Sequence, residues 1–186
     1  KDDPEIRHEL LKRLNPLPSS LRLRIVDNLA RQAPEDDFAH DLLLEYDNDT
    51  DVQIKTSAAI GYARAIRERG EDQASFIEKV TEGIQAIGLD LHERRQAAFA
   101  GLLELDRLDI VINADKTAQE SLKHIEFSGL GDTNHRLASH LAKHWGRVKN
   151  TFGATFWERI GYIPNEFLEE IAFQINEPDL IEKVID

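Results

Sequence analysis

The chain of 186 residues contains no cysteine. It therefore has no disulfide framework, no thiolate metal ligand and no cysteine nucleophile. Basic residues are also few, since 23 Lys and Arg stand against 35 Asp and Glu, and the formal net charge is -12. This balance argues against duplex DNA or an anionic membrane as the main partner, because each phosphate contact requires a cation.

Long apolar runs are absent as well. The longest, Ala97 to Leu103, is interrupted by Gly101 and is far shorter than the roughly 20 residues of a membrane span. The hydrophobic content of 41% with 31% charged residues is typical of a soluble folded chain. The sequence opens on Lys1 rather than Met and shows no signal peptide. We therefore expect a cytoplasmic fragment of a larger protein.

Proline is missing between Pro34 and Pro164, which leaves long helices possible over this whole stretch. The stretch is rich in good helix formers, and its apolar residues recur every three or four positions, as in Ile54, Ala58 and Tyr62. The strict alternation typical of a strand is hard to find. The sequence therefore predicts an all-α fold.

Short polar side chains that can cap a helix mark the expected helix starts. They are Ser20, Asp51, Asp90, Asp132 and, after Pro164, Asn165. Partner helices are expected at about 3–14, 35–46, 72–88, 115–127 and 151–161, with a last segment at 178–185. The predicted organisation is a series of helix pairs joined by short turns.

Aligned on these starts, the second helices repeat a pattern every 31 to 42 residues. A cation stands four positions after the start in Arg24, Lys55, Arg94 and Arg136. A large apolar residue and then a small one follow at offsets nine and ten, in Leu29-Ala30, Ile60-Gly61, Phe99-Ala100 and Leu141-Ala142. A small residue allows two helices to approach closely. Such a period is typical of arrays whose units bury their faces only against neighbours.

Two segments resemble the HEAT-repeat family, residues 49–55 followed by Ala58-Ala59 and residues 90–94 followed by Ala97-Ala98. Each has the family's acidic turn, an apolar residue with Arg or Lys, and then paired alanines. The resemblance implies an α-solenoid of about five helical hairpins, with 1–186 as one array and 149–186 as a divergent last repeat or cap. It also implies a ladder of charged pairs that joins neighbouring repeats, formed by Asp51, Lys55, Asp90, Arg94, Asp132 and Arg136.

The segment 134–157 carries basic residues and no Asp or Glu. On a single helix its basic side chains would form one stripe and its apolar side chains another. We expect the apolar stripe to be buried and the basic stripe to be exposed. The exposed stripe would be either a solvated face or a site for an acidic peptide, a phosphate or a nucleic-acid backbone. Its candidate binding residues are Arg136, His140, Lys143 and Arg147.

Motifs for catalysis and cofactor binding are missing. His140 and His144 are four residues apart and could share a metal ion, but no HExxH motif accompanies them and the sequence specifies no third ligand. There is no phosphate-binding GxxxxGK loop and no GxSxG elbow. We therefore expect no catalytic residue, no metal and no cofactor.

These observations favour a non-catalytic HEAT-like scaffold that binds a protein partner or another domain of its own chain, as a sensing or regulatory array of a larger protein. Neither nucleic acid nor a membrane is expected as the partner. The alternative is a nucleic-acid-binding solenoid similar to the HEAT-like DNA glycosylases, which would use the basic stripe at 134–149. A second open question is the segment from Glu35 to Asp51, which has eight acidic residues and no Lys or Arg. It is either a solvated face or a docking face for a basic partner.

Overall fold

The computed structural model describes residues 4–46, 49–85, 92–113 and 134–152, together with 169, 171, 172 and 175. Over these ranges all regular secondary structure is helical and no strand occurs, which confirms the all-α prediction. The helices are α1 (Pro4–Leu14), α2 (Ser19–Gln32), α3 (Asp37–Glu45), α4 (Val52–Arg69), α5 (Ala74–Gln85), α6 (His92–Leu105), α7 (Leu108–Asn113), α9 (His135–Lys143) and α10 (Trp145–Phe152). None of them is long and apolar enough to cross a bilayer.

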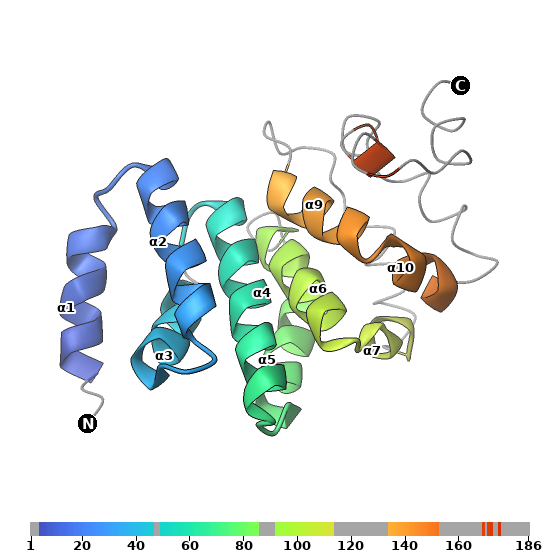
Figure 1. Cartoon of the computed structure of the whole chain (residues 1–186), viewed down its shortest axis with the longest axis horizontal. Helices are drawn as coiled ribbons and strands as arrows, with labels where there is room; N and C mark the ends of the chain where they lie inside the picture. The colour runs from blue at the N-terminus through green and yellow to red at the C-terminus, as the bar shows by residue number, and fades with distance from the viewer. Residues whose placement is uncertain are drawn as a thin grey trace.

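Three helices, α2, α4 and α6, lie side by side in a row (Figure 1). The contacts of α4 with α6 and of α2 with α4 are the most extensive between described helices. Helix α3 packs against α2 and α4, and α5 packs against α6. Each helix of the row therefore buries its side chains mainly against the next one in the row.

Helix α4 contributes side chains to two hydrophobic cores. One core lies between α2, α3 and α4, and the other extends from α4 and α5 through α6 to α9 and α10. Tyr62 packs against both cores. Its ring stacks on His40 with centroids 4.4 Å apart and lies tilted against Phe76 at 5.4 Å. The cores are thus joined through one aromatic side chain of α4.

The close approach expected at the small residues is confirmed between α2 and α4. A Cβ added to Gly61 would lie 2.4 Å from the Cβ of Ala30, so the two helix backbones leave no room for a larger side chain. In α6, Ala100 is fully buried. The adjacent Gly101 would bring a Cβ within 2.8 Å of the Phe76 ring. Small residues therefore set the distance between neighbouring helices here.

The predicted helix starts agree with the structure in one case and differ in two. Asp51 caps α4, because its carboxylate accepts a hydrogen bond from the backbone N–H of Gln53 at 2.9 Å. Ser20 is not a cap, since α2 begins at Ser19 directly after Pro18 and has no side-chain cap. Its first turn is closed instead by the Pro18 carbonyl, which accepts hydrogen bonds from the backbone N–H groups of Leu21 and Arg22.

The third start is displaced from Asp132 to Asn134, the N-cap of α9. The side-chain oxygen of Asn134 accepts from the backbone N–H of Leu137 at 3.1 Å. Asp90 and Asp132 lie outside the described residues. So do the helices expected at 115–127 and 178–185, most of 151–161 and most of the helix expected after Asn165, of which Glu169, Ile171 and Ala172 are described and helical. The short helix α7 was not predicted.

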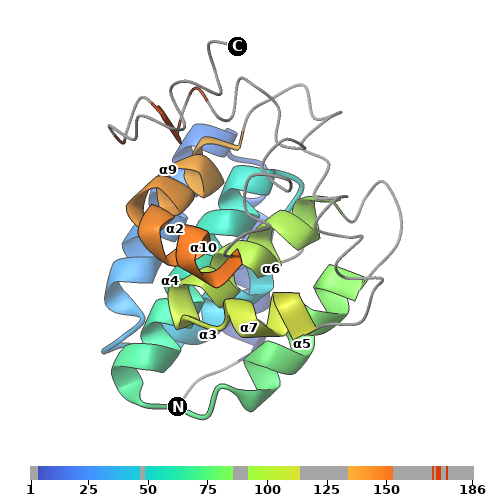
Figure 2. The same cartoon turned by 90° about the vertical axis from the view of Figure 1, so that its right-hand side faces the viewer.

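Helices α9 and α10 do not continue the row. They run obliquely to α4 and α6 (Figure 1), and in the view of Figure 2 α9 lies above α4 and α6. Helix α9 contacts both α4 and α6, and α10 contacts α7. The segment 134–152 therefore contacts three other helices, α4, α6 and α7.

Candidate functional site

The single helix expected over 134–149 is interrupted at His144. Helix α9 ends at Lys143, and His144, with φ -110 and ψ 18, closes it before α10 starts at Trp145. The apolar stripe is nevertheless buried as predicted, because the interruption keeps it on the side that faces the core. Its members are Leu137, Leu141, Trp145 and Val148.

The expected basic stripe is not a row of free, exposed side chains. Lys143 is exposed, but the side chain of His140 is only 5% exposed, so the prediction of solvent exposure is wrong for His140. The reason is that α9 lies across α4 and α6, which places His140 against α6. Periodicity within one helix cannot show which other helix covers a given side.

The two arginines of this stripe hold α9 and α10 to the rest of the fold. Arg136 forms an ion pair with Asp27 of α2 at 2.5 Å. Arg147 donates to the backbone carbonyl of Leu103 at 3.0 Å and lies 3.1 Å from a carboxylate oxygen of Asp106. Of the four residues of the stripe, Arg136 and Arg147 therefore bind groups of the same chain, His140 is buried, and Lys143 is exposed.

The charged ladder implied by the family resemblance stays a prediction for most of its members. Asp51 caps its own helix, and Lys55 is buried in α4. Arg136 pairs with Asp27, a residue that the ladder did not include. The other members, Asp90, Asp132 and the side chain of Arg94, lie outside the described residues.

Three side chains that can bind a metal meet where α9 covers α6. They are Glu104 of α6, His140 of α9 and His144 at the junction of α9 and α10. The Oε2 atom of Glu104 lies 3.6 Å from Nε2 of His140 and 3.7 Å from Nε2 of His144. The three atoms lie within 4.8 Å of one another, and the two imidazole rings meet edge to face with centroids 4.7 Å apart.

Two arginines of α4 hold the other oxygen of the same carboxylate. Oε1 of Glu104 lies 2.8 Å from Nη2 of Arg67 and 3.4 Å from Nε of Arg64. Arg67 also donates to the backbone carbonyl of Glu104 at 2.8 Å. These contacts orient the carboxylate so that Oε2 points to the histidines. Oε2 and both Nε2 atoms are buried and have no hydrogen-bond partner among the described residues.

The surroundings favour a charged carboxylate beside two neutral imidazoles. Burial raises the pKa of Glu104, but its interactions with Arg64, His140 and Arg67 outweigh the effect of burial, so the pKa is lowered. Burial, and then the neighbouring His144, lower the pKa of His140 to about 4. Burial, and then Arg147, lower the pKa of His144 as well. This is the protonation state in which these side chains bind metals.

Sequence reasoning noticed the two histidines of this cluster but missed Glu104. The available signal was local, because Glu104 is the only charged residue in the run Leu102-Leu103-Glu104-Leu105. A carboxylate in a buried apolar run requires a partner. Which partner it finds depends on the position of α4 and α9, and the sequence does not show that position.

Asn134 fastens the first turn of α9 to two other helices. Its side-chain amide donates to the Thr56 hydroxyl at 2.9 Å and to Oε1 of Gln96 at 2.7 Å. All three residues are buried. One side chain therefore caps α9 and joins it to α4 and α6.

We expect Asn134→Ala to lower the free energy of unfolding by about 2–4 kcal/mol. The variant loses a helix cap, which costs about 1 kcal/mol, and leaves the buried Thr56 and Gln96 without a donor, which costs about 1–3 kcal/mol. Urea unfolding followed by circular dichroism measures the change. Asn134→Ser keeps the cap and should recover about 1 kcal/mol. If Asn134→Ala loses no more unfolding free energy than Asn28→Ala, a change at an exposed position of α2, then Asn134 does not join α9 to α4 and α6 as described.

The acidic segment from Glu35 to Asp51 supplies partners within the fold. Asp36 and Asp51 cap α3 and α4. Asp37 pairs with Arg69, Asp41 with Arg7 and Asp49 with Arg22. This use of its carboxylates favours a structural role over a docking face for a basic partner.

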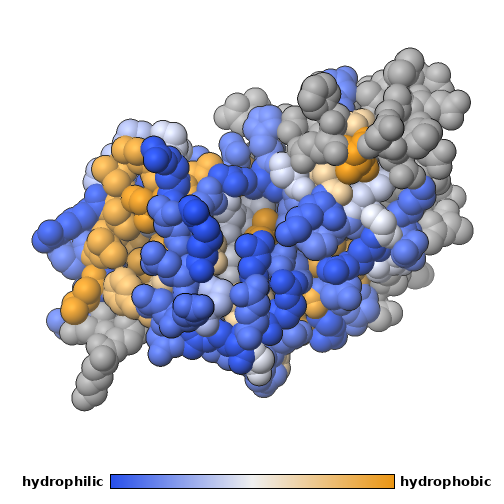
Figure 3. All heavy atoms as spheres, in the orientation of Figure 1, coloured by the Kyte–Doolittle hydropathy of each residue, from blue (hydrophilic) through white to orange (hydrophobic). Residues whose placement is uncertain are grey.

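Exposed apolar surface is concentrated at the N-terminal end of the row. Among the described residues, the large hydrophobic side chains exposed to solvent are Ile6 of α1, at 59%, and Leu21 of α2, at 43%. Figure 3 shows apolar residues gathered at this end of the molecule.

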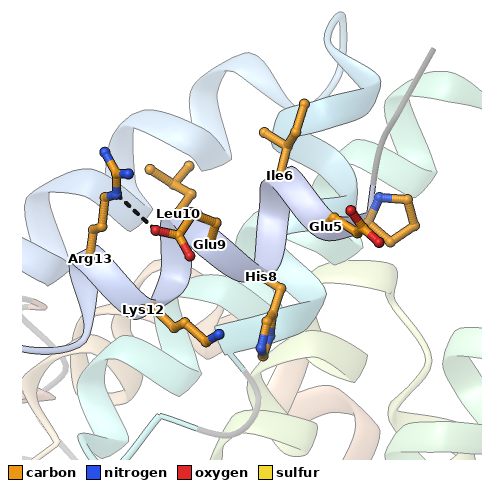
Figure 4. A pocket seen from close by; sticks show the side chains of 8 residues that line it. Glu5, Ile6, His8, Glu9, Leu10, Lys12 and Arg13 are labelled. Carbon is orange, nitrogen blue, oxygen red and sulfur yellow. Dashed lines mark hydrogen bonds and ion pairs between the residues drawn. The ribbon is translucent and has the colours of Figure 1, made fainter.

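An open hollow of about 910 Å³ lies beside α1. Figure 4 shows the side chains that line it, and every one of them belongs to α1. They include Ile6 and Leu10, together with the exposed ion pair of Glu9 and Arg13 at 3.2 Å. Among the described residues one helix provides the lining, as expected for an open surface rather than an enclosed cavity.

No family model, curated protein or solved structure matches this chain.

Proposed function

We propose that the chain is a HEAT-like α-solenoid that works as a non-catalytic scaffold in the cytoplasm and binds another protein or another domain of its own polypeptide. The side-by-side row of α2, α4 and α6 supports the repeat architecture, as does the contact of Ala30 with Gly61. The setting in a sensing or regulatory array of a larger protein rests on the HEAT-like sequence pattern.

The observation that carries the proposed binding role is the apolar surface of α1 and α2. Ile6 of α1 and Leu21 of α2 expose their side chains to solvent. Apolar residues that gather on the surface of a soluble protein, as Figure 3 shows at the N-terminal end of the row, are typical of contacts with other proteins. The exposed face of α1 and α2 is therefore the proposed docking surface.

Nucleic-acid binding is the alternative, and the charged stripe gives it little support. Arg136 and Arg147 already lie against carboxylates, and His140 is buried. Within the described part of segment 134–152, this leaves Lys143 as the exposed cation of the proposed stripe. One such cation is too few for the several phosphate contacts that a nucleic-acid site needs.

The docking surface is tested by the double variant Ile6→Glu/Leu21→Glu. Cross-linking and affinity capture from the source cells, followed by mass spectrometry, should recover a partner with the wild-type chain and lose it with this variant. Both positions are exposed, so we expect an unchanged unfolding curve. The matched control Asn28→Asp/Gln32→Glu adds the same two negative charges at exposed positions of α2 and should retain the partner. If both double variants retain the partner equally, this surface is not the site that binds it.

A salt titration of DNA binding, measured by fluorescence anisotropy, separates the two functions. We expect no saturable binding at physiological salt. Tight binding that weakens steeply with salt and is lost in Arg136→Ala/Arg147→Ala would support the nucleic-acid function instead.

A further inference from the structure

The cluster of Glu104, His140 and His144 lies away from the proposed docking surface and takes no part in it. We propose that these three side chains bind one divalent transition-metal ion, of which zinc is the best match. The inference rests on the geometry and burial of the cluster and is independent of the scaffold role.

The donor atoms have the chemistry and spacing of a zinc site. Two imidazole nitrogens and one carboxylate oxygen are a recurrent ligand set for this ion. Ligand atoms at about 2.0–2.1 Å from a tetrahedral zinc ion lie about 3.3 Å from one another. The separations of 3.6 and 3.7 Å between the carboxylate oxygen and the two nitrogens are close to this value. All three atoms lie within 4.8 Å of one another, so an ion bound by all of them requires rotations that draw the side chains closer together.

Burial supplies the second observation. The side chains of Glu104 and His140 are only 2% and 5% exposed, and each presents a polar atom to the same point. Those atoms have no hydrogen-bond partner among the described residues. Buried polar atoms without partners are rare in folded proteins because each one costs free energy. A single cation would satisfy the carboxylate oxygen and both nitrogens.

The arginines of α4 restrict which ion can bind. Arg64 and Arg67 contact Oε1 of Glu104 and orient the carboxylate, as the hydrogen-bond partners of ligands do in metal sites. Their positive charges also repel a cation, and the site has one carboxylate. Magnesium and calcium require several oxygen ligands and are therefore disfavoured. Ions that bind imidazole strongly, such as zinc and cobalt, are favoured.

The position of the ligands indicates a structural role for the ion. Glu104 belongs to α6, whereas His140 and His144 lie on either side of the last turn of α9. An ion held by all three would fasten the junction of α9 and α10 to the row of helices. Three protein ligands leave a fourth position for water or an added ligand.

The direct test uses the full chain without an affinity tag, stripped of metal by a chelator. Isothermal titration with zinc chloride should show one saturable site per chain, and magnesium chloride should show none. Cobalt in place of zinc should give the visible absorption bands of a four- or five-coordinate site. The melting temperature should rise with free zinc concentration, because the ion binds only the folded chain.

Variants show whether these residues form the site. His144→Asn and Glu104→Gln should each weaken zinc binding at least about tenfold, because the loss of a ligand should cost no less than the loss of a group that only orients a ligand. His144→Asn is the safer variant for folding, because that side chain is 14% exposed. His8→Asn removes an exposed histidine of α1 and should leave the affinity unchanged.

Two results would overturn the proposal. One is the absence of any saturable zinc site in a wild-type chain whose circular dichroism shows it to be folded. The other is wild-type affinity in folded His144→Asn and Glu104→Gln. Retention of the protein partner in Ile6→Glu/Leu21→Glu would reject the docking surface but would not change either zinc measurement, so the two proposals fail separately.

Discussion

Replacing Gly61 with leucine is expected to lower the free energy of unfolding by about 3 kcal/mol or more, the upper range for a side chain forced into a packed core. Even a methyl group at this position would lie 2.4 Å from the Cβ and 3.0 Å from the Cα of Ala30. Neither atom is on a flexible side chain, so α2 and α4 must separate. Urea unfolding measures the loss.

Three further variants isolate the steric effect at Gly61. Gly61→Ala should destabilise the chain less than leucine does, because it adds one methyl group in place of a larger side chain, and about 1 kcal/mol of helix propensity offsets part of its clash. Adding Ala30→Gly to Gly61→Ala should restore part of the stability. Gly146→Ala serves as the control, since no atom lies within 4 Å of its added Cβ, and it should be neutral or stabilise by up to about 1 kcal/mol. Wild-type stability in Gly61→Leu would mean that α2 and α4 do not meet at this residue.

Replacing Asp49 with alanine is expected to cost about 3–5 kcal/mol, as does the removal of one partner from a buried ion pair. The side chain of Asp49 is 1% exposed and that of Arg22 is 10% exposed, with Nη1 and Oδ2 2.5 Å apart. Asp49 also accepts a hydrogen bond from the backbone N–H of Asp51 at 2.8 Å. The variant would leave the charge of Arg22 buried without its partner.

An exposed pair provides the comparison for Asp49. Glu9→Ala removes the partner of Arg13 at the surface of α1 and should cost less than about 1 kcal/mol, because solvent screens exposed pairs. The double variant Arg22→Met/Asp49→Leu should be more stable than Asp49→Ala, since it removes both charges together. Urea unfolding measures both variants. Equal losses of unfolding free energy in Asp49→Ala and Glu9→Ala would show that the buried pair of Arg22 and Asp49 stabilises the fold no more than an exposed pair does.

Several local features were predictable because they depend on residues a few positions apart. The three- and four-residue spacing of Ile54, Ala58 and Tyr62 indicated a helix, and α4 contains all three. The cap at Asp51 followed from a short acidic side chain at the start of that helix. The alignment of Ala30 with Gly61 also indicated where helices approach closely.

The predictions for segment 134–149 show where local reasoning ends. Its apolar stripe was predicted correctly, because a helix must bury that side somewhere. The fate of His140 was not, because a basic side chain on the opposite side can be exposed or covered. The interruption at His144 and the oblique position of α9 decided that it is covered.

From the sequence alone, the helical class could be determined, together with one helix cap and the small residues between α2 and α4. These properties depend on the backbone preferences and spacing of residues within a few turns. Tertiary structure decided that Glu104 meets His140, and that Arg136 reaches Asp27 across 109 positions of the chain. Such meetings depend on which helices pack across one another, and that choice is made by the whole core rather than by any one segment.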